Sequence, residues 1–339
     1  MTLINMTPAV ITPAQYPTDK SGRRYIVTSH SIDGTFESCP RRFEFRHIYQ
    51  RLPLTEPRGL AADVGTALHE AAQEWTKERD TQAADLTLLR WWPWQLEAQR
   101  QDAGLNDSKR TLGNALLLLS QIQADPFWDE WEVARLPNGE YAIELAWRIN
   151  HVSLGSFPHP VDGGPVYLAT QGKIDWILRH RRDRWRYMVC DLKTTVQDEP
   201  AQQASFRFSG QAGQYGLVLS AAINHPWQTE GMDVTYFIAE FSDHGQPITN
   251  PMVHHLEPEE IYESIEAKNE RLQRMVRMGS AGFWPRRSHG CAFYGTPCGF
   301  LDICSRRDPQ YLEQWFTFDR DLEFVRESRV YEPLWTLEA

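Results

Sequence analysis

The stretch that decides the fold is GKIDWIL at residues 172–178, followed by RYMVCDLKTT at residues 186–195. Residues two apart on a strand share a face, so Asp191 and Lys193 project together. If the two stretches pair as a hairpin, Asp175 lies beside Asp191, and a divalent cation such as Mg²⁺ or Mn²⁺ would relieve the repulsion between their carboxylates. The lysine could then orient water and stabilise charge on a phosphorus. An ordinary surface ion pair at a strand end is the alternative interpretation.

The segments around this hairpin indicate an α/β core of strands flanked by helices. A helical stripe that begins at Ile32 is expected to be capped by Ser31 and broken at Pro40. Alternating or apolar runs predict further strands at 141–149, 233–241 and 252–257. The remaining helices are expected at 65–79, 85–124, 201–222 and 258–278, and residues 1–28 are expected to form a loose arm.

Three further side chains could belong to the same site. His69 follows Gly65 by four residues and lies off the apolar face of its helix, so it is a candidate third metal ligand that would favour Mn²⁺. Gln211 and Tyr215 are four residues apart on one helix face, where they could contact a phosphate or sugar and stack on a base. Helix packing on the sheet explains this spacing equally well, and a lone helical histidine is usually structural.

Composition excludes several classes of protein. The 339 residues are 41% hydrophobic and 24% charged, as in a globular chain, and no apolar run is long enough to span a membrane. The first residues lack the basic start of a secretory signal, so a cytoplasmic protein is expected. Five cysteines do not make a disulfide scaffold. The formal net charge of −10 argues, taken alone, against a nucleic-acid partner.

Six segments in order resemble the PD-(D/E)XK nuclease superfamily, and specifically its RecB-like domains, which include AddB and the CRISPR-associated adaptation nucleases. They are TSHSIDGTFESCPRRFEFRHI (28–48), GTALHE (65–70), GKID (172–175), DLKTT (191–195), QAGQY (211–215) and a terminal group of cysteines. The resemblance implies a restriction-endonuclease-like core with a mixed central sheet at residues 29–307. The helical pattern predicts an inserted helical layer at about 80–130, and residues 308–339, with eight acidic residues and three arginines, form an acidic tail.

The resemblance also assigns roles. It implies that His69, Asp175, Asp191 and the backbone carbonyl of Leu192 bind the metal and that Lys193 is the catalytic lysine. It implies that Gln211 and Tyr215 position the substrate.

Four cysteines form a separate candidate site. Cys291, Cys298 and Cys304 lie within fourteen positions, and Cys39 lies far upstream. Four thiolates suit either tetrahedral Zn²⁺ or an iron–sulfur cluster. The resemblance selects a 4Fe–4S cluster that clamps the ends of the nuclease domain, with zinc as the alternative, although the C-x6-C spacing is longer than the usual two-residue gap. Cys190 is expected in the core.

We therefore expect a metal-dependent deoxyribonuclease acting on DNA ends or single strands in recombination, repair or processing. One alternative is a non-catalytic DNA-end-binding module that works with a helicase, integrase or recombinase, and another is a zinc-stabilised α/β hydrolase of different substrate. The acidic net charge does not exclude DNA, because residues 41–51 and 271–307 carry net charges of +3 and +6, from 4 − 1 and 7 − 1. If these stretches meet, they could form a positive rim for phosphates.

Overall fold

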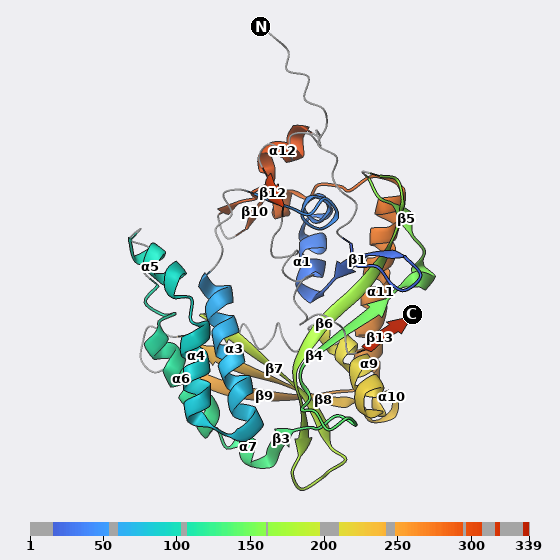
Figure 1. Cartoon of the computed structure of the whole chain (residues 1–339). Helices are drawn as coiled ribbons and strands as arrows, with labels where there is room; N and C mark the ends of the chain where they lie inside the picture. The colour runs from blue at the N-terminus through green and yellow to red at the C-terminus, as the bar shows by residue number, and fades with distance from the viewer. Residues whose placement is uncertain are drawn as a thin grey trace. The chain divides into compact units, whose positions relative to one another are not determined.

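The computed structural model describes residues 16–53, 60–102, 107–160, 162–196, 210–241, 248–293, 296–306, 316–318 and 335–338. Within them, nine strands join one mixed sheet flanked by helices, which confirms the predicted fold class (Figure 1). The chain divides into two compact units that are both discontinuous in sequence. The first comprises residues 1–57, 146–172 and 267–339, and the second comprises residues 58–145 and 173–266.

The sheet of the second unit is built on the predicted hairpin. The antiparallel pairing of β6 (Pro165–His180) with β7 (Tyr187–Thr195) sets Trp176 opposite Cys190. Strand β7 runs parallel to β8 (Met232–Glu240), which is antiparallel to β9 (Ile248–Leu256), while β3 (Trp131–Val133) pairs with β6. Because parallel strands need a crossover, α9 (Gln211–Ile223) and the short α10 (Trp227–Glu230) lie between β7 and β8 in the chain.

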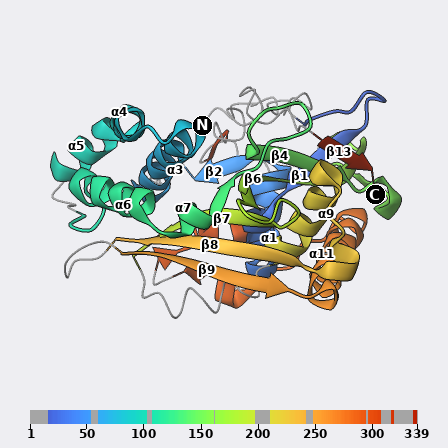
Figure 2. The ribbon, with the colours of Figure 1, turned by 90° about the horizontal axis from the view of Figure 1, so that it is seen from below.

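A layer of helices covers this part of the sheet, as Figure 2 shows for α3 to α6. The layer comprises α3 (Leu60–Glu78), α4 (Thr81–Trp91), α5 (Trp94–Asp102), α6 (Leu112–Ala124) and α7 (Phe127–Glu130). The buried stripe of α3 includes Val64, Leu68 and Trp75, which pack with Leu192 and Phe237 of the sheet. The helices expected at 85–124 therefore exist, as three separate elements.

The first unit contains the first and the last elements of the described chain. Strand β1 (Arg24–Thr28) runs parallel to the first half of β6, so these five residues are ordered rather than part of a loose arm. Ser29, not Ser31, caps α1 (His30–Ser38) by accepting a hydrogen bond from the Ile32 amide. Its further elements are α2 (Pro40–Phe43), η2 (Glu44–Ile48), β2 (Arg51–Pro53), η3 (Val152–Leu154), β5 (Phe157–Pro158), η4 (Ser288–Gly290), β10 (Ala292–Phe293), β11 (Thr296–Pro297), α12 (Leu301–Arg306), β12 (Phe316–Phe318) and β13 (Trp335–Glu338).

Three elements pass from one unit to the other: β6, α11 (Pro258–Ser280) and β4 (Ile143–Asn150), which pairs with β13. Residues 201–209 of the expected helix and most of the acidic tail lie outside the described residues. Among the described helices, none is long and apolar enough to cross a membrane.

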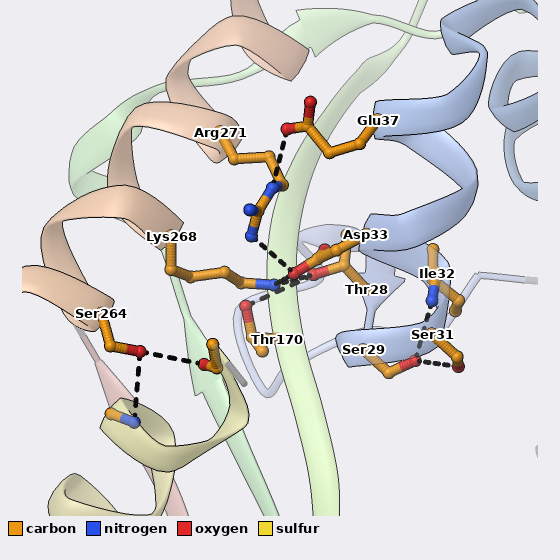
Figure 3. A network of polar contacts seen from close by, with 12 residues as sticks. Thr28, Ser29, Ser31, Ile32, Asp33, Glu37, Thr170, Ser264, Lys268 and Arg271 are labelled. Carbon is orange, nitrogen blue, oxygen red and sulfur yellow. Dashed lines mark hydrogen bonds and ion pairs between the residues drawn. The ribbon is translucent and has the colours of Figure 1, made fainter. Parts of the chain in front are cut away.

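A buried ionic network links α1 to α11 in the first unit (Figure 3). Lys268 Nζ lies 2.5 Å from Asp33 Oδ2 and also donates to Thr28, and both members of the ion pair are buried. Arg271 donates to Asp33 and to Glu37. A buried ion pair whose partner is removed leaves a desolvated charge, so this network strongly favours one packing of the two helices.

Candidate functional site

Asp175 and Asp191 approach each other across the β6–β7 hairpin, as the alternation predicted. The register of Trp176 opposite Cys190 sets Asp175 opposite Asp191, and both carboxylates are buried. Asp175 Oδ2 accepts a hydrogen bond of 2.8 Å from the Leu192 amide. Burial, and next the charge of Asp191, raise the pKa of Asp175 well above its ordinary value. Two buried carboxylates that repel each other favour a cation bound between them.

Lys193 lies beside these carboxylates and forms an ion pair with Asp191. Burial lowers the pKa of Lys193, but Asp191 and Asp175 raise it by more, so the pKa is higher than that of a free lysine. The side chain therefore carries a positive charge at neutral pH. Strand alternation explains the placement, because Asp191 and Lys193 share a face while Cys190 packs into the hydrophobic core on the other.

His69 reaches the hairpin from α3. Its Nδ1 atom lies 3.4 Å from Asp175 Oδ2, and burial lowers its pKa, which favours the neutral imidazole that a metal requires. The close approach of α3 to β7 depends on Gly65, because a Cβ there would lie 3.0 Å from the Thr194 hydroxyl. The glycine four residues before His69 is thus explained by packing.

Glu144 completes the group, and sequence reasoning missed it. Ligand atoms of His69, Glu144 and Asp175 lie within 4.8 Å of one another, the one such group among the described residues. Glu144 pairs with Lys173 and accepts a hydrogen bond of 2.5 Å from Gln73. Its φ of +51° is rare for a non-glycine residue and lies at the second residue of β4, where the side chain joins the site.

Asp191 is not in this compact group, because its carboxylate faces the ammonium of Lys193 instead. A carboxylate pair with one histidine fits a divalent cation of mixed oxygen and nitrogen preference, such as Mn²⁺, and Asp191 lies close enough to influence His69 electrostatically. The donor set therefore fits the metal that the sequence predicted, with Glu144 added to it.

A cavity of about 310 Å³ opens beside the group. His69, Glu144, Lys173 and Thr194 line it, together with Ala61, Ala62, Gly65, Thr66 and Glu70. The cavity is lined by both acidic and basic side chains, which suits a ligand that carries a metal and a phosphate together.

Tyr215 lies near the same carboxylates. Burial, and next the charge of Asp191, raise the pKa of its phenol. Gln211 stands one turn earlier on α9 and is half-buried. The structure thus brings Tyr215 to the site on the face that the four-residue spacing predicted, and the role of both residues in positioning substrate stays a prediction.

The four remaining cysteines gather in the first unit. Cys39, Cys291, Cys298 and Cys304 line one cavity, and the Cys298 amide donates to the Cys291 carbonyl. Gly290 allows this approach, because a Cβ there would lie 2.8 Å from the Cβ of Cys39. Among the described residues, no three of the four sulfurs lie within 4.8 Å of one another.

Comparison with known proteins gives one family. A family model described as the PD-(D/E)XK nuclease superfamily matches residues 28–305. The crystal structure of a presumed exonuclease from Eubacterium rectale is 11% identical, with a TM-score of 0.46, and the match covers 86% of this chain and 97% of that chain. The structure of a protein named SSO0001 is 14% identical, with a TM-score of 0.26 and coverages of 72% and 85%. No curated protein matches. The family match includes every candidate residue named above.

Proposed function

Because the chain belongs to the PD-(D/E)XK nuclease superfamily, we propose that it is a divalent-metal-dependent nuclease that hydrolyses phosphodiester bonds of DNA. One observation carries the proposal: His69, Glu144 and Asp175 converge within 4.8 Å at the hairpin that also bears Lys193. These residue types come from three separate elements, α3, β4 and the β6–β7 hairpin. If Asp191 and Lys193 were only a surface ion pair at a strand end, His69 and Glu144 would have no reason to converge beside them.

The site residues divide into metal ligands and groups that act on the substrate. His69, Glu144, Asp175 and Asp191 would hold Mg²⁺ or Mn²⁺, with the carbonyl of Leu192 as a further ligand. When bound, the cation would polarise the scissile phosphate and make water a stronger nucleophile. The chain supplies a buried, mostly preorganised setting for this chemistry, because Asp175 is held by the Leu192 amide.

Lys193 contributes a positive charge at a defined position. Its ion pair with Asp191 orients the ammonium, and that charge can hold the attacking water and oppose the negative charge that develops on the phosphate oxygens. Gln211, which is half-buried, would contact the nucleic acid through its amide. The Tyr215 ring is fully buried, so it would support the site from behind and would not stack on a base.

The finer assignment is a RecB-like nuclease, an exonuclease of DNA ends or single strands in recombination, repair or processing, stabilised by a 4Fe–4S cluster on Cys39, Cys291, Cys298 and Cys304. The four cysteines line one cavity, which supports a shared thiolate site. Four thiolates suit a cluster or Zn²⁺, and the choice of the cluster comes from the resemblance to the RecB-like domains.

Degradation of labelled single- and double-stranded DNA with Mn²⁺ tests the activity. Lys193→Ala and Asp191→Ala should each lower the rate by at least about a hundredfold, while Lys77→Ala, at an exposed position on α3, should leave it unchanged. Equal rates in all variants would refute the site. Binding of DNA without cleavage by the wild type would favour the alternative, a DNA-end-binding module. A colourless preparation with stoichiometric zinc would refute the cluster.

A further inference from the structure

A strongly basic turn joins β6 to β7 in the second unit. Residues 179–186 read RHRRDRWR, with five arginines and one aspartate, which gives a net charge of 5 − 1 = +4 in a chain whose total is −10. Residues 181–186 are all exposed. The site described above does not use any of them.

Three of the five arginines form ion pairs with neighbouring strands. Arg179 and Arg181 pair with Glu132 of β3. Arg186 pairs with Asp233 of β8, and its guanidinium lies 5.3 Å from the centre of the Trp131 ring. These contacts hold the base of the turn against the neighbouring strands.

The turn itself is ordered by its own polar groups. His180 Nδ1 accepts hydrogen bonds from the amides of Arg182 and Asp183. Asp183 Oδ1 accepts from the Trp185 amide, and the Arg186 amide donates to the Asp183 carbonyl. The one carboxylate of the turn thus accepts from the backbone, and within the described residues it forms no ion pair with an arginine.

Two arginine side chains and one tryptophan side chain of the turn make none of these contacts. Within the part of the chain that the structure describes, Arg182 and Arg184 form no ion pair, and Trp185 is 89% exposed. Exposing a whole indole to water is unfavourable, at roughly 25 cal/mol for each Å² of apolar surface. A hydrogen-bonded turn that presents a bare aromatic ring next to arginines without an ion pair has the chemistry of a single-stranded nucleic-acid contact, in which bases stack and phosphates pair.

We propose that the tip of this hairpin, Arg182, Arg184 and Trp185, is a second nucleic-acid contact that binds a single strand, with a base stacked on Trp185 and phosphates on the two arginines. The proposal rests on the nuclease function proposed above and adds a substrate preference to it. Asp175 and Arg181 are six residues apart along the β6 strand and its turn, which spans about 20 Å, or about six base steps at 3.4 Å each. The tip therefore binds nucleic acid beyond the bond that is cut, so it affects long substrates and not the shortest ones.

The chain contains a matched control. Arg90 and Trp91 form an Arg–Trp pair on α4 of the same unit, both are exposed, and Trp91 is 48% exposed. Arg184→Ala/Trp185→Ala and Arg90→Ala/Trp91→Ala therefore remove the same two side chains from different places. Binding of fluorescent single strands of about 4 and about 20 nucleotides, shorter and longer than the span, is measured by anisotropy on the full chain with EDTA, which prevents cleavage.

The hairpin variant should bind the long strand about tenfold more weakly than the wild type, and its salt slope should fall by about 0.7, because one arginine no longer neutralises a phosphate. The control variant, and the short strand with either variant, should not change. Arg184→Lys/Trp185→Phe should keep most of the affinity, because it retains the charge and the ring. Urea unfolding midpoints establish that each variant is folded.

Equal affinity of the hairpin and control variants for the long strand would overturn the proposal. So would an equal loss on duplex DNA, because paired bases offer no free face to Trp185. Mn²⁺-dependent DNA degradation by the wild type is measured in parallel. If the wild type degrades DNA but the hairpin variant binds the long strand as well as the wild type does, only the second contact is refuted. If the wild type neither binds nor degrades DNA, the nuclease function itself is refuted.

Discussion

Replacing Asp175 by asparagine should give a variant that is more stable than the wild type without metal and less stable with it. Asp175 is only 7% exposed, and its carboxylate lies within 4.8 Å of that of Glu144. Two unit charges at that distance repel by about 3.5 kcal/mol at an effective dielectric constant of about 20. Lys173 and Lys193 offset part of this repulsion. We therefore expect the variant to gain about 1–2 kcal/mol in the free energy of unfolding in EDTA.

Mn²⁺ should reverse the order of stability, so that the wild type becomes more stable than the variant. A ligand at a hundredfold excess over its Kd stabilises the folded state by about 2.7 kcal/mol, and the wild type should show this gain. The asparagine side chain keeps an oxygen that can accept from the Leu192 amide but lacks the negative charge, so the variant should gain much less. Urea unfolding followed by tryptophan fluorescence, with EDTA and with Mn²⁺, measures both differences.

The control is an acid of similar burial whose charge is compensated. Asp33 is 3% exposed and pairs with the buried Lys268. Asp33→Asn leaves that ammonium unpaired, so it should lose about 3–5 kcal/mol under both conditions. If Asp175→Asn were also destabilised in EDTA, or if Mn²⁺ stabilised it as much as the wild type, Asp175 would not be a metal ligand held against repulsion.

Three further perturbations test separate parts of the molecule. Gly290→Ala adds a Cβ 2.7 Å from the Ser38 carbonyl oxygen and 2.8 Å from the Cys39 Cβ, which should cost about 1–3 kcal/mol. It should also lower the iron and sulfide content that the proposed cluster would give the purified protein. Glu144→Gln should weaken Mn²⁺ binding at least about tenfold, as measured by the electron paramagnetic resonance signal of the free ion. Burial lowers the pKa of His47 to about 3, below its value of 6.5 when unfolded, so the unfolded state takes up the proton first and stability falls as the pH falls. Between about pH 7.5 and about pH 5.5 the loss should be about 1 kcal/mol, and His47→Phe should flatten that part of the urea stability profile.

The core of the site could be predicted because it depends on local patterns. Strand alternation put Asp191 and Lys193 on one face, and a hairpin between neighbouring segments set Asp175 opposite Asp191. His69 required a contact distant in sequence, and the resemblance to a known family supplied it. A local pattern alone gave no reason to bring α3 to β7.

Glu144 could not be predicted for two physical reasons. Its partners depend on β4 lying next to β6, and strand order does not follow from the sequence of either strand. Its direction depends on a φ of +51°, which tertiary contacts must impose on a glutamate. In an alternating run such as YAIELAWRI, a glutamate is read as the solvated face of a strand.

The errors at the N-terminal end have similar causes. Ser29 and Ser31 are both good capping residues, and their hydroxyls lie 3.1 Å apart, so local propensity does not choose between them. Strand β1 pairs in parallel with residues about 140 positions away. Such a partner is invisible to a short window that also contains several prolines.

Net charge counted along the sequence is a poor guide to a nucleic-acid surface, because it does not separate paired from unpaired arginines. In the basic stretch that begins at residue 271, Arg271 and Arg274 pair with Glu37, and Arg287 donates to the Glu37 carbonyl. These arginines hold α1, and their charge is largely used within the fold. The turn at 179–186 has fewer arginines, yet two of them have no ion pair within the described residues and stand beside a bare indole. An unpaired cation attracts phosphate, whereas a paired one must first lose its partner, so the smaller cluster is the stronger candidate for binding nucleic acid.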